Sequence, residues 1–432
     1  MDARDCAALA LRRCRRDGAF SSDAPDSAVK KAGLSGRDAA FASAIFFGVQ
    51  QNITLLDFYI DTWSAVKSKK LEPQVLDILR MSVYQIVFMD RVPNSAAVNT
   101  GVDMCKKDNA RASGLVNAVL RHVSENAEKL PEPKGNGAEY LSVKYSHPLW
   151  IVREFIEDLG ENGAREVLAA NNSAAPLTLR VNTLKISRDK LIKMLASAEF
   201  SASPHPLGCD SILVDGGNVT GMPGFDEGLF FVQDAAASLA AAAAGPLACD
   251  SVLDVCAAPG GKSFSTAMLM NNAGRIVACD INKNKLSRIE AGAKRLGISI
   301  IETREMDARE PHAEFIEAFD TVLADLPCSG LGVIRKKPDI RFNKQSDVEA
   351  LPQIQLELLC GAAHCVKPGG LLLYSTCTVR SSENSGVVGS FLSENEDFDR
   401  EGFCLSDSGE ITFWPHTDNT DGFYICRLRR KK

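Results

Sequence analysis

The sequence lacks the signals of several protein classes. None of its 13 cysteines forms a Cys-x-x-Cys pair, the spacing typical of structural zinc sites, so we expect no bound metal. A leading apolar segment is missing, and the alanine-rich stretch 235–244 is too short and too weakly apolar to span a bilayer. An odd number of cysteines without a disulfide pattern fits a reducing compartment. We therefore expect a cytoplasmic protein with no membrane partner.

Two phosphate-binding motifs are also absent. The segment Gly261-Lys262-Ser263 would need a glycine at position 256 to complete a P-loop, but that residue is Cys256. The spacing G-x-G-x-x-G of dinucleotide-binding folds does not occur either. These absences argue against a ligand that is held by its phosphates.

Composition and charge describe a folded protein with an uneven charge distribution. Apolar residues make up 45% and charged residues 24% of the chain, which excludes a disordered or fibrous protein. The net charge is −6. Through Tyr145 there are 20 Lys and Arg against 17 Asp and Glu, a net charge of +3, which leaves −9 for the rest. A nucleic acid would therefore have to be bound by local basic patches.

Three folded parts are predicted along the chain. Residues 1–128 show apolar positions at helical spacing and no strand alternation, which predicts an all-α bundle. Its arginine cluster fits a solvated helix face better than an RNA contact. Residues 129–145, rich in proline and glycine, are expected to be a linker. Residues 146–234 are predicted to form a small α+β module. The arginines of the cluster are Arg12, Arg13, Arg15 and Arg16.

The third folded part, residues 235–432, alternates short apolar runs with helical patterns, as βαβ units do. Ser346 and Glu349 form a capping-box pattern that predicts the start of a helix running towards Val366. A doubly wound α/β domain with a mostly parallel sheet is the expected result. The predicted strands are Ser251–Val255, Ile276–Cys279, Ile298–Ile301, Thr321–Ala324 and Leu371–Tyr374.

The loops that follow these strands contain the residues of a nucleoside site. Gly260 and Gly261 would let the backbone approach a ligand at a helix start. Asp280, after the second strand, is placed to bind ribose hydroxyls, and Asp307, after the third, to accept from an adenine amino group. Each aspartate alone is equally well explained as a helix cap or loop carboxylate. Their order indicates an adenosine without phosphates, and S-adenosylmethionine fits that description.

Two thiols follow the last two strands, Cys328 beside Asp325 and Cys377 in Ser-Thr-Cys-Thr. Carbon 5 of a pyrimidine is a poor nucleophile, and a thiolate that adds to carbon 6 activates it. Asp325 would hydrogen-bond the ring nitrogen and the exocyclic amine of a cytosine. Positive charge from Lys262 or a sulfonium would favour the thiolate. The pattern therefore favours methyl transfer to carbon 5.

The segments DVCAAPGGKS, ADLPCSGLGVIRKKPDIRF and YSTCTV resemble the RNA 5-methylcytosine methyltransferases of the Sun/Fmu family. The resemblance implies a Rossmann-like catalytic domain that uses S-adenosylmethionine. It also implies that Cys377 is the nucleophile and that Cys328 assists product release, an order that rests on the resemblance alone because DNA cytosine methyltransferases attack from their Pro-Cys element. The implied cofactor positions are Cys256, Ala257, Ala258, Pro259, Gly260, Gly261, Lys262, Asp280, Asp307 and Asp325.

The N-terminal part extends this resemblance. RVPNSAAVNTGVDMCKK and GLVNAVLRHV are similar to the NusB-like RNA-binding domain that precedes this catalytic domain in a bacterial 16S rRNA methyltransferase. The implied partner is 16S rRNA or an early small-subunit particle, bound by a monomer. A basic cluster after the Pro-Cys element lies where the phosphates of a bound strand would pass. Its members are Arg335, Lys336, Lys337 and Arg341.

Two alternatives remain open at this point. The same chemistry on tRNA or on large-subunit rRNA would use the same residues. A non-catalytic NusB-like RNA-binding or assembly factor would not need them, and the presence of Cys328, Asp325 and Cys377 argues against that reading.

Overall fold

The protein is described by a computed structural model that covers residues 1–17 and 23–432. The chain divides into two compact units. Unit 1 comprises Met1–Ser173 and Ile334–Asn343, and unit 2 comprises Ala174–Val333 and Lys344–Lys432. The short segment Ile334–Asn343 therefore belongs with the N-terminal helices, although its place in the sequence lies inside the predicted catalytic domain.

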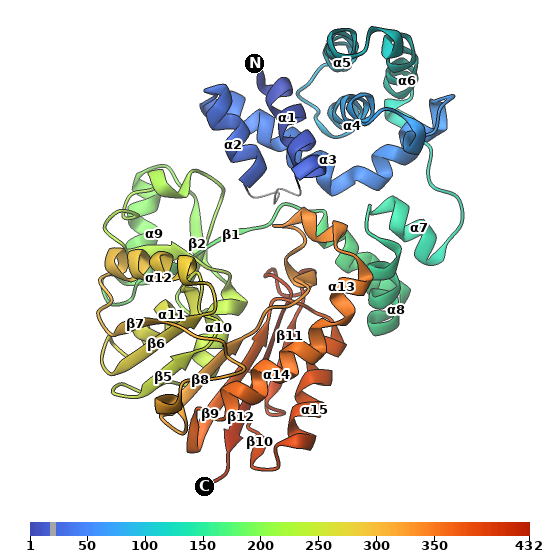
Figure 1. The fold of residues 1–432 in the computed structure, drawn as a ribbon. Coiled ribbons are helices and arrows are strands. Elements are labelled where there is room, and N and C mark those ends of the chain that lie inside the picture. Colours follow the sequence, from blue (N-terminus) through green and yellow to red (C-terminus); the bar gives the residue numbers. More distant parts are fainter. Residues whose placement is uncertain (18–22) are drawn as a thin grey trace. The chain divides into compact units, whose positions relative to one another are not determined.

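Unit 1 contains the predicted helical bundle (Figure 1). Apolar side chains at helical spacing, such as Leu79, Val83 and Val119, are at most 1% exposed and form its core, as expected for amphipathic helices. The all-α prediction is confirmed. The bundle helices are α1 (Ala3–Asp17), α2 (Asp23–Ala32), α3 (Gly36–Trp63), α4 (Pro73–Phe88), α5 (Asn94–Asp108) and α6 (Ser113–Glu125).

Among the described residues, α3 alone is long and apolar enough to cross a membrane by length and composition. The sequence-based expectation considered only the stretch 235–244 and missed this helix. Ile45, Phe46 and Ile60 of α3 are fully buried in the core of the bundle. Its apolar character is therefore explained by packing against the other helices of unit 1.

Unit 1 continues beyond the bundle. The predicted linker 129–145 contains a helix, α7 (Gly137–Lys144), because Leu141 is fully buried and the Thr54 amide donates to Ser146 Oγ over 2.8 Å. The long helix α8 (Leu149–Asn171) follows. The proline- and glycine-rich composition hid this helix, since the stabilising contacts come from residues far away in the sequence.

The arginine cluster of α1 makes contacts within unit 1. Arg12 is paired with Asp108 and Arg15 with Asp77, while Arg13 Nη1 donates to Ser27 Oγ over 2.6 Å. These contacts agree with the interpretation of the cluster as a helix face rather than as an RNA site.

Unit 2 begins with a small antiparallel sheet in the order β2-β3-β1-β4. Helix α9 (Arg188–Ser197) packs Leu191 and Leu195 on it. Asn182 Nδ2 donates to the carbonyls of Gly228 and Leu296, both over 2.8 Å, and so joins this module to the large domain. The strands are β1 (Leu177–Val181), β2 (Ala202–Pro204), β3 (Ser211–Val214) and β4 (Phe230–Val232).

The large sheet of unit 2 has five parallel strands in the order β7-β6-β5-β8-β9. The predicted α/β architecture is confirmed. The third strand begins at Ile301 rather than at Ile298, and the sheet continues into three antiparallel strands that were not predicted. The strands are β5 (Ser251–Asp254), β6 (Arg275–Asp280), β7 (Ile301–Glu305), β8 (Phe319–Asp325), β9 (Val366–Thr376), β10 (Phe398–Arg400), β11 (Glu410–Phe413) and β12 (Phe423–Arg430).

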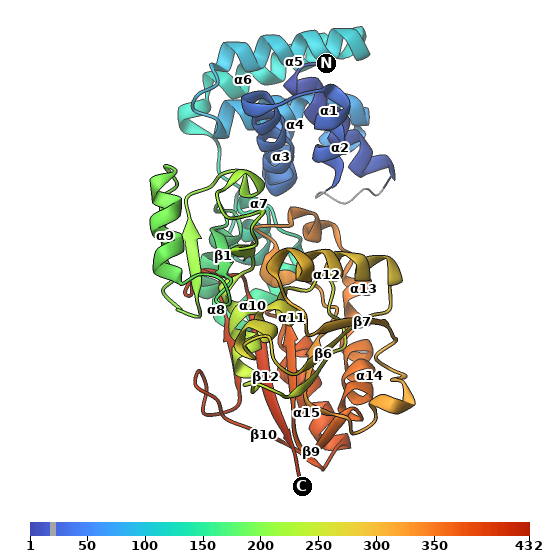
Figure 2. The same cartoon turned by 90° about the vertical axis from the view of Figure 1, so that its left-hand side faces the viewer.

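Helices cover both faces of this sheet, as Figures 1 and 2 show. Alternate strand residues point to opposite layers: Val322 packs with α14 and α15, and Leu323 packs with α10, α11 and α12. The helices are α10 (Ala235–Ala243), α11 (Gly261–Leu269), α12 (Lys283–Leu296), α14 (Leu351–Ala363) and α15 (Ser385–Glu394).

The predicted helix start at Ser346 is wrong in detail. Ser346 lies inside a short helix, α13 (Gln345–Glu349), whose N-cap is Lys344, so no capping box forms. A separate helix, α14, then begins at Leu351, directly before Pro352. Proline is favoured in the first turn of a helix and disfavoured in its interior, which explains the break.

The strand order determines where a ligand binds. From β5 the chain proceeds to β6 and β7 on one side, and it then returns to β8 on the other side of β5. Ligands of doubly wound sheets bind at such a reversal, outside the carboxyl ends of the strands. We therefore expect the functional site in the loops after β5, β8 and β9.

Candidate active site

The loop between β5 and α11 is shaped for close contact with a ligand. Gly260 adopts a φ of 109°, and a Cβ there would lie 2.4 Å from the Phe264 ring, so only glycine fits. Behind the loop, Asp254 is 1% exposed and accepts from Ser263 Oγ over 2.6 Å. Burial raises the pKa of Asp254 to about 7. The pKa of Cys256 in the same loop is also raised by burial, which makes it a packed thiol rather than a nucleophile.

Two predicted cofactor residues follow β6 and β7. Asp280 ends β6, is 6% exposed, and accepts from the Asn282 amide over 2.9 Å. Asp307 has an ion pair with Arg309 at 2.6 Å, and the hydrogen bonds from Arg309 lower its pKa. The carboxylate of Asp307 thus already has a cationic partner, which the sequence did not predict.

The residues of these loops fit S-adenosylmethionine. The carboxylate of Asp280 suits a pair of ribose hydroxyls, and α11 begins at Gly261 with free backbone N–H groups. Gln233 Nε2 is buried without a hydrogen-bond partner, 3.3 Å from the place a Cβ of Gly261 would take. Such an orphan donor beside an open backbone indicates room for a polar ligand.

Lys262 and Asp325 form the charged centre of the site. Lys262 Nζ donates to Asp325 Oδ2 over 2.5 Å, and Ser375 Oγ donates to Asp325 Oδ1 over 2.9 Å. Lys262 Nζ also lies 4.9 Å from the centre of the Phe423 ring. Both oxygens of Asp325 are therefore oriented, and the strand end of β8 is tied to that of β9.

The two predicted thiols lie side by side. Cys328 Sγ is 3.3 Å from Cys377 Sγ, and both residues are partly buried. The hydrogen bond to Cys377, followed by burial, raises the pKa of Cys328 well above its ordinary value. Cys328 is thus held as a thiol in hydrogen-bond contact with the sulfur of Cys377.

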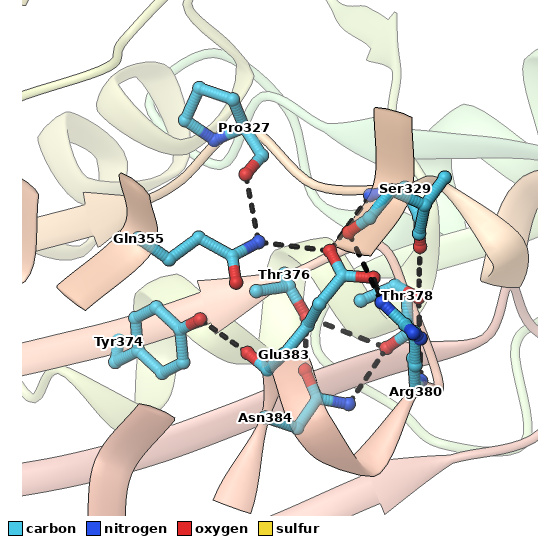
Figure 3. Close-up of polar contacts among 10 residues, drawn as sticks. Pro327, Ser329, Gln355, Tyr374, Thr376, Thr378, Arg380, Glu383 and Asn384 are labelled. Carbon is cyan, nitrogen blue, oxygen red and sulfur yellow. Dashed lines mark hydrogen bonds and ion pairs between the residues drawn. The ribbon is translucent and has the colours of Figure 1, made fainter. Parts of the chain in front are cut away.

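Several polar residues around the thiols were not predicted. Ser375 binds Asp325 directly, and Gln355, Glu383 and Asn384 form a buried network beneath the two cysteine loops (Figure 3). No spacing rule connects Gln355 on α14 to residues near Cys377. The one available signal was a charged residue and an amide, at 383 and 384, just before an apolar helix.

The basic cluster after the Pro-Cys element lies in unit 1, and its members differ in exposure to solvent. Lys336 and Lys337 are exposed, and Arg335 is half-buried. Arg341 is 3% exposed; it donates to Asn172 Oδ1 over 2.6 Å and lies 3.3 Å from His147 Nε2.

Arg341 was predicted to contact RNA phosphates, and its burial corrects that prediction. Burial lowers the pKa of Arg341 to about 9. Burial, together with the charge of Arg341, lowers the pKa of His147 well below its ordinary value. The guanidinium is therefore an interior group of unit 1 with neutral partners, and Lys336 and Lys337 are the exposed cations of the cluster.

The basic C-terminus is part of the sheet. Arg427 and Arg429 of β12 both pair with Glu401, and Arg430 pairs with Asp397 at 2.9 Å. These arginines are held by carboxylates, so β12 is a structural strand of the sheet.

Comparisons with known proteins identify the families that the chain resembles. The family model of 16S rRNA methyltransferases RsmB/F matches residues 242–429. The NusB family model matches residues 1–125, and the model of the RsmF/B-like ferredoxin-like domain matches residues 147–220.

Relatives and solved structures resemble the chain over its full length. A probable ribosomal RNA small subunit methyltransferase B from Bacillus subtilis is 34% identical, over 99% of this chain and 98% of that protein. The Cronobacter sakazakii ribosomal RNA small subunit methyltransferase B is 31% identical, over 92% of each chain. The solved structure of PH0851 is 27% identical with a TM-score of 0.81, covering 100% of this chain and 99% of that one.

A further solved structure supports the fold over two thirds of the chain. A methyltransferase homologue from Pyrococcus horikoshii is 26% identical with a TM-score of 0.60, over 67% of this chain and 97% of that one. Full-length identity above 30% and the three family matches agree on one assignment. The chain belongs to the family of S-adenosylmethionine-dependent 16S rRNA methyltransferases RsmB/F, with a NusB domain at its N-terminus.

Proposed function

We propose that this protein transfers a methyl group to carbon 5 of a cytosine in 16S rRNA through a covalent adduct with Cys377. The observation that carries the proposal is the 3.3 Å separation of Cys328 Sγ and Cys377 Sγ at neighbouring strand ends. Methylation of an exocyclic amino group would not require a thiol. A pair of thiols at neighbouring strand ends supplies one sulfur for each step of such catalysis, the first to add to carbon 6 and the second to remove the proton from carbon 5.

The chemistry proceeds in two stages. S-adenosylmethionine, when bound, supplies an electrophilic methyl group. The Cys377 thiolate adds to carbon 6 of cytosine, the electron density gained at carbon 5 forms the new carbon–methyl bond, and the sulfur–methyl bond breaks. Cys328, after giving its own proton to solvent, takes the proton from carbon 5, and the bond between carbon 6 and Cys377 breaks so that Cys377 leaves as the thiolate and the product is released.

Asp325 and Lys262 prepare the cytosine for attack. Asp325, with its oxygens fixed by Lys262 and Ser375, accepts from the exocyclic amine and holds the ring over Cys377. Lys262, paired with Asp325 at 2.5 Å, holds that carboxylate in place for the amine. Preorganised charge of this kind is a large contributor to enzymatic rate.

The RNA is expected to be single-stranded at the target. A cytosine in a helix must be swung out at a cost of a few kcal/mol, so an unpaired residue is the economical substrate. The exposed Lys336 and Lys337 supply phosphate contacts that are independent of sequence. We expect this reaction in the cytoplasm, on 16S rRNA or on an early small-subunit particle.

Bisulfite sequencing of total RNA from cells with and without the gene tests the substrate. The proposal predicts that one cytosine of 16S rRNA loses its protection from conversion when the gene is deleted. Re-expression of the wild-type chain should restore protection, and a Cys377→Ala chain should not. A protected cytosine lost from tRNA or large-subunit rRNA instead would contradict the assignment to 16S rRNA.

A further inference from the structure

Both cysteine loops are tied to two adjacent buried residues, Glu383 and Asn384 (Figure 3). Glu383 ends a short 3-10 helix (Ser381–Glu383) and is fully buried, and Asn384, directly before α15, is 2% exposed. Burying a carboxylate is costly unless its partners compensate. The partners of these two residues are the chain segments on either side of the two thiols.

Glu383 holds the loop that contains Cys328. Its Oε2 accepts from the Ser329 amide and from Gln355 Nε2, both over 2.9 Å. Gln355 Nε2 also donates to the Pro327 carbonyl over 2.9 Å. The residues immediately before and after Cys328 are therefore both connected to one carboxylate. Arg380 Nη1 lies 3.9 Å from Glu383 Oε1 and offsets its charge.

Asn384 holds the loop that contains Cys377. Its Oδ1 accepts from Thr376 Oγ1 over 2.6 Å, and its Nδ2 donates to the Thr378 carbonyl over 3.1 Å. The residues on both sides of Cys377 are thus fixed by one amide. A further hydrogen bond of 2.8 Å between Ser329 Oγ and Thr378 Oγ1 joins the two loops directly.

We propose that Glu383 and Asn384 are positioning residues with separate tasks, Glu383 for the step performed by Cys328 and Asn384 for the step performed by Cys377. The inference rests on the proposed function. Positioning groups that support a reacting atom keep it within a fraction of an ångström of productive geometry. Loss of the Glu383 contacts should therefore slow product release, and loss of the Asn384 contacts should slow adduct formation.

Glu383 also acts on Cys328 through its charge. After the hydrogen bond to Cys377 and burial, the negative charges of Cys377 and Glu383 raise the pKa of Cys328. Other ionisable groups also lie in this region. Burial, then the charges of Cys328 and Glu383, followed by those of Cys426 and Asp325, raise the pKa of Tyr374, and Arg380 faces Glu383. Removing the charge of Glu383 while keeping its shape should let Cys328 lose its proton at lower pH.

The test uses the full-length protein, S-adenosylmethionine and a 16S rRNA transcript under single-turnover conditions. Samples quenched in denaturant and separated on a denaturing gel give the amount of covalent protein–RNA adduct over time. Glu383→Ala, Glu383→Gln, Asn384→Ala and Cys328→Ala are compared with the wild type. Glu357→Gln is the matched control, because it makes the same carboxylate-to-amide change on the exposed face of α14, where Glu357 Oε1 accepts from Gln353 Nε2.

Glu383→Ala should form the adduct within about threefold of the wild-type rate but lose it at least about tenfold more slowly. Asn384→Ala should form the adduct about tenfold more slowly and accumulate none. Glu383→Gln, which keeps an acceptor for Ser329, should release product with a pH midpoint below that of the wild type. Glu357→Gln should behave as the wild type in both steps.

Equal slowing of both steps by both alanine variants would overturn the separate tasks, as would an unchanged pH midpoint in Glu383→Gln. If Glu383→Ala does not fold, the pH dependence of product release in Glu383→Gln still tests the role of Glu383. The failure of the proposed function looks different: Cys328→Ala would then form no adduct at all. If Cys328→Ala accumulates adduct while the Glu383 variants match the wild type, the positioning role alone is wrong.

Discussion

Lys262 Nζ donates to Asp325 Oδ2 over 2.5 Å, while the other oxygen of Asp325 accepts from Ser375. This relationship joins three strand ends, since Lys262 follows β5, Asp325 ends β8 and Ser375 lies near the end of β9. The cofactor loop and the cysteine loops therefore share one carboxylate. A change at Asp325 should affect catalysis without dismantling either loop.

Asp325→Asn is predicted to reduce the single-turnover rate of methylation by about 100-fold. The amide keeps the size of the side chain but loses the negative charge that Lys262 and the cytosine amine require. Asp320→Asn is the matched control, because Asp320 pairs with Lys367 at the opposite end of the same strand. A rate in Asp325→Asn within a few-fold of that control would contradict the role given to this carboxylate.

Asp280→Asn is predicted to weaken binding of S-adenosylmethionine by about 10- to 100-fold, the equivalent of one or two charge-assisted hydrogen bonds. The methylation rate at saturating S-adenosylmethionine should change little, since Asp280 is proposed to bind the ribose and takes no part in the steps at the thiols. Isothermal titration with S-adenosylmethionine measures the effect. Glu302→Gln, on the edge strand β7, serves as the control. Equal affinity for S-adenosylmethionine in the two variants would refute the ribose assignment.

Asp254 makes stability depend on pH. Burial raises the pKa of Asp254 from 3.8 to about 7. The contribution of this group to the free energy of unfolding is therefore fully present below its unfolded pKa and is lost as pH rises through about 7. Urea unfolding of the wild type should therefore show a stability loss of up to about 4 kcal/mol between about pH 4 and pH 8 from this group. Asp254→Asn should lose less stability over the same range, and an identical pH dependence in both proteins would contradict the burial argument.

The exposed and buried cations of the basic cluster should respond differently to mutation. Removing Lys336 and Lys337 together is predicted to weaken RNA binding. The slope of log affinity against log salt concentration should also become shallower, by about 0.7 for each lost phosphate contact. Arg341→Ala should instead lower the unfolding midpoint, because Asn172 loses its donor. RNA-binding isotherms at several salt concentrations measure the first effect and urea titrations the second. An unchanged salt slope in the lysine variant would contradict the phosphate contacts.

The sequence predicted best what depends on local pattern. Apolar runs predicted β5, β6 and β8 to within two residues at each end, because buried parallel strands are short and continuously apolar. The apolar part of β9 was also predicted, but the strand begins at Val366 rather than at Leu371 because it continues through the Lys-Pro-Gly-Gly segment. The residues at the ends of those strands, including Cys328 and Cys377, could be placed at one edge of a sheet from topology alone.

What the sequence could not predict depends on contacts between distant residues. The helix at 137–144 exists through the burial of Leu141, and the interior place of Arg341 depends on Asn172 and His147, far away in the chain. The convergence of Gln355 and Glu383 beneath Cys328 has the same origin. Charged residues are read from sequence as exposed, so buried carboxylates and guanidinium groups are the ones most easily misplaced.

The most direct test of the account is to identify the atom that bonds to RNA. Cys328→Ala, incubated with S-adenosylmethionine and 16S rRNA, should give a denaturant-stable adduct whose nuclease and protease digest contains a nucleotide attached to the peptide of Cys377, as measured by mass spectrometry. Cys377→Ala should give none. An adduct on residue 328 in the Cys377→Ala protein, or no adduct in either variant, would contradict Cys377 as the nucleophile.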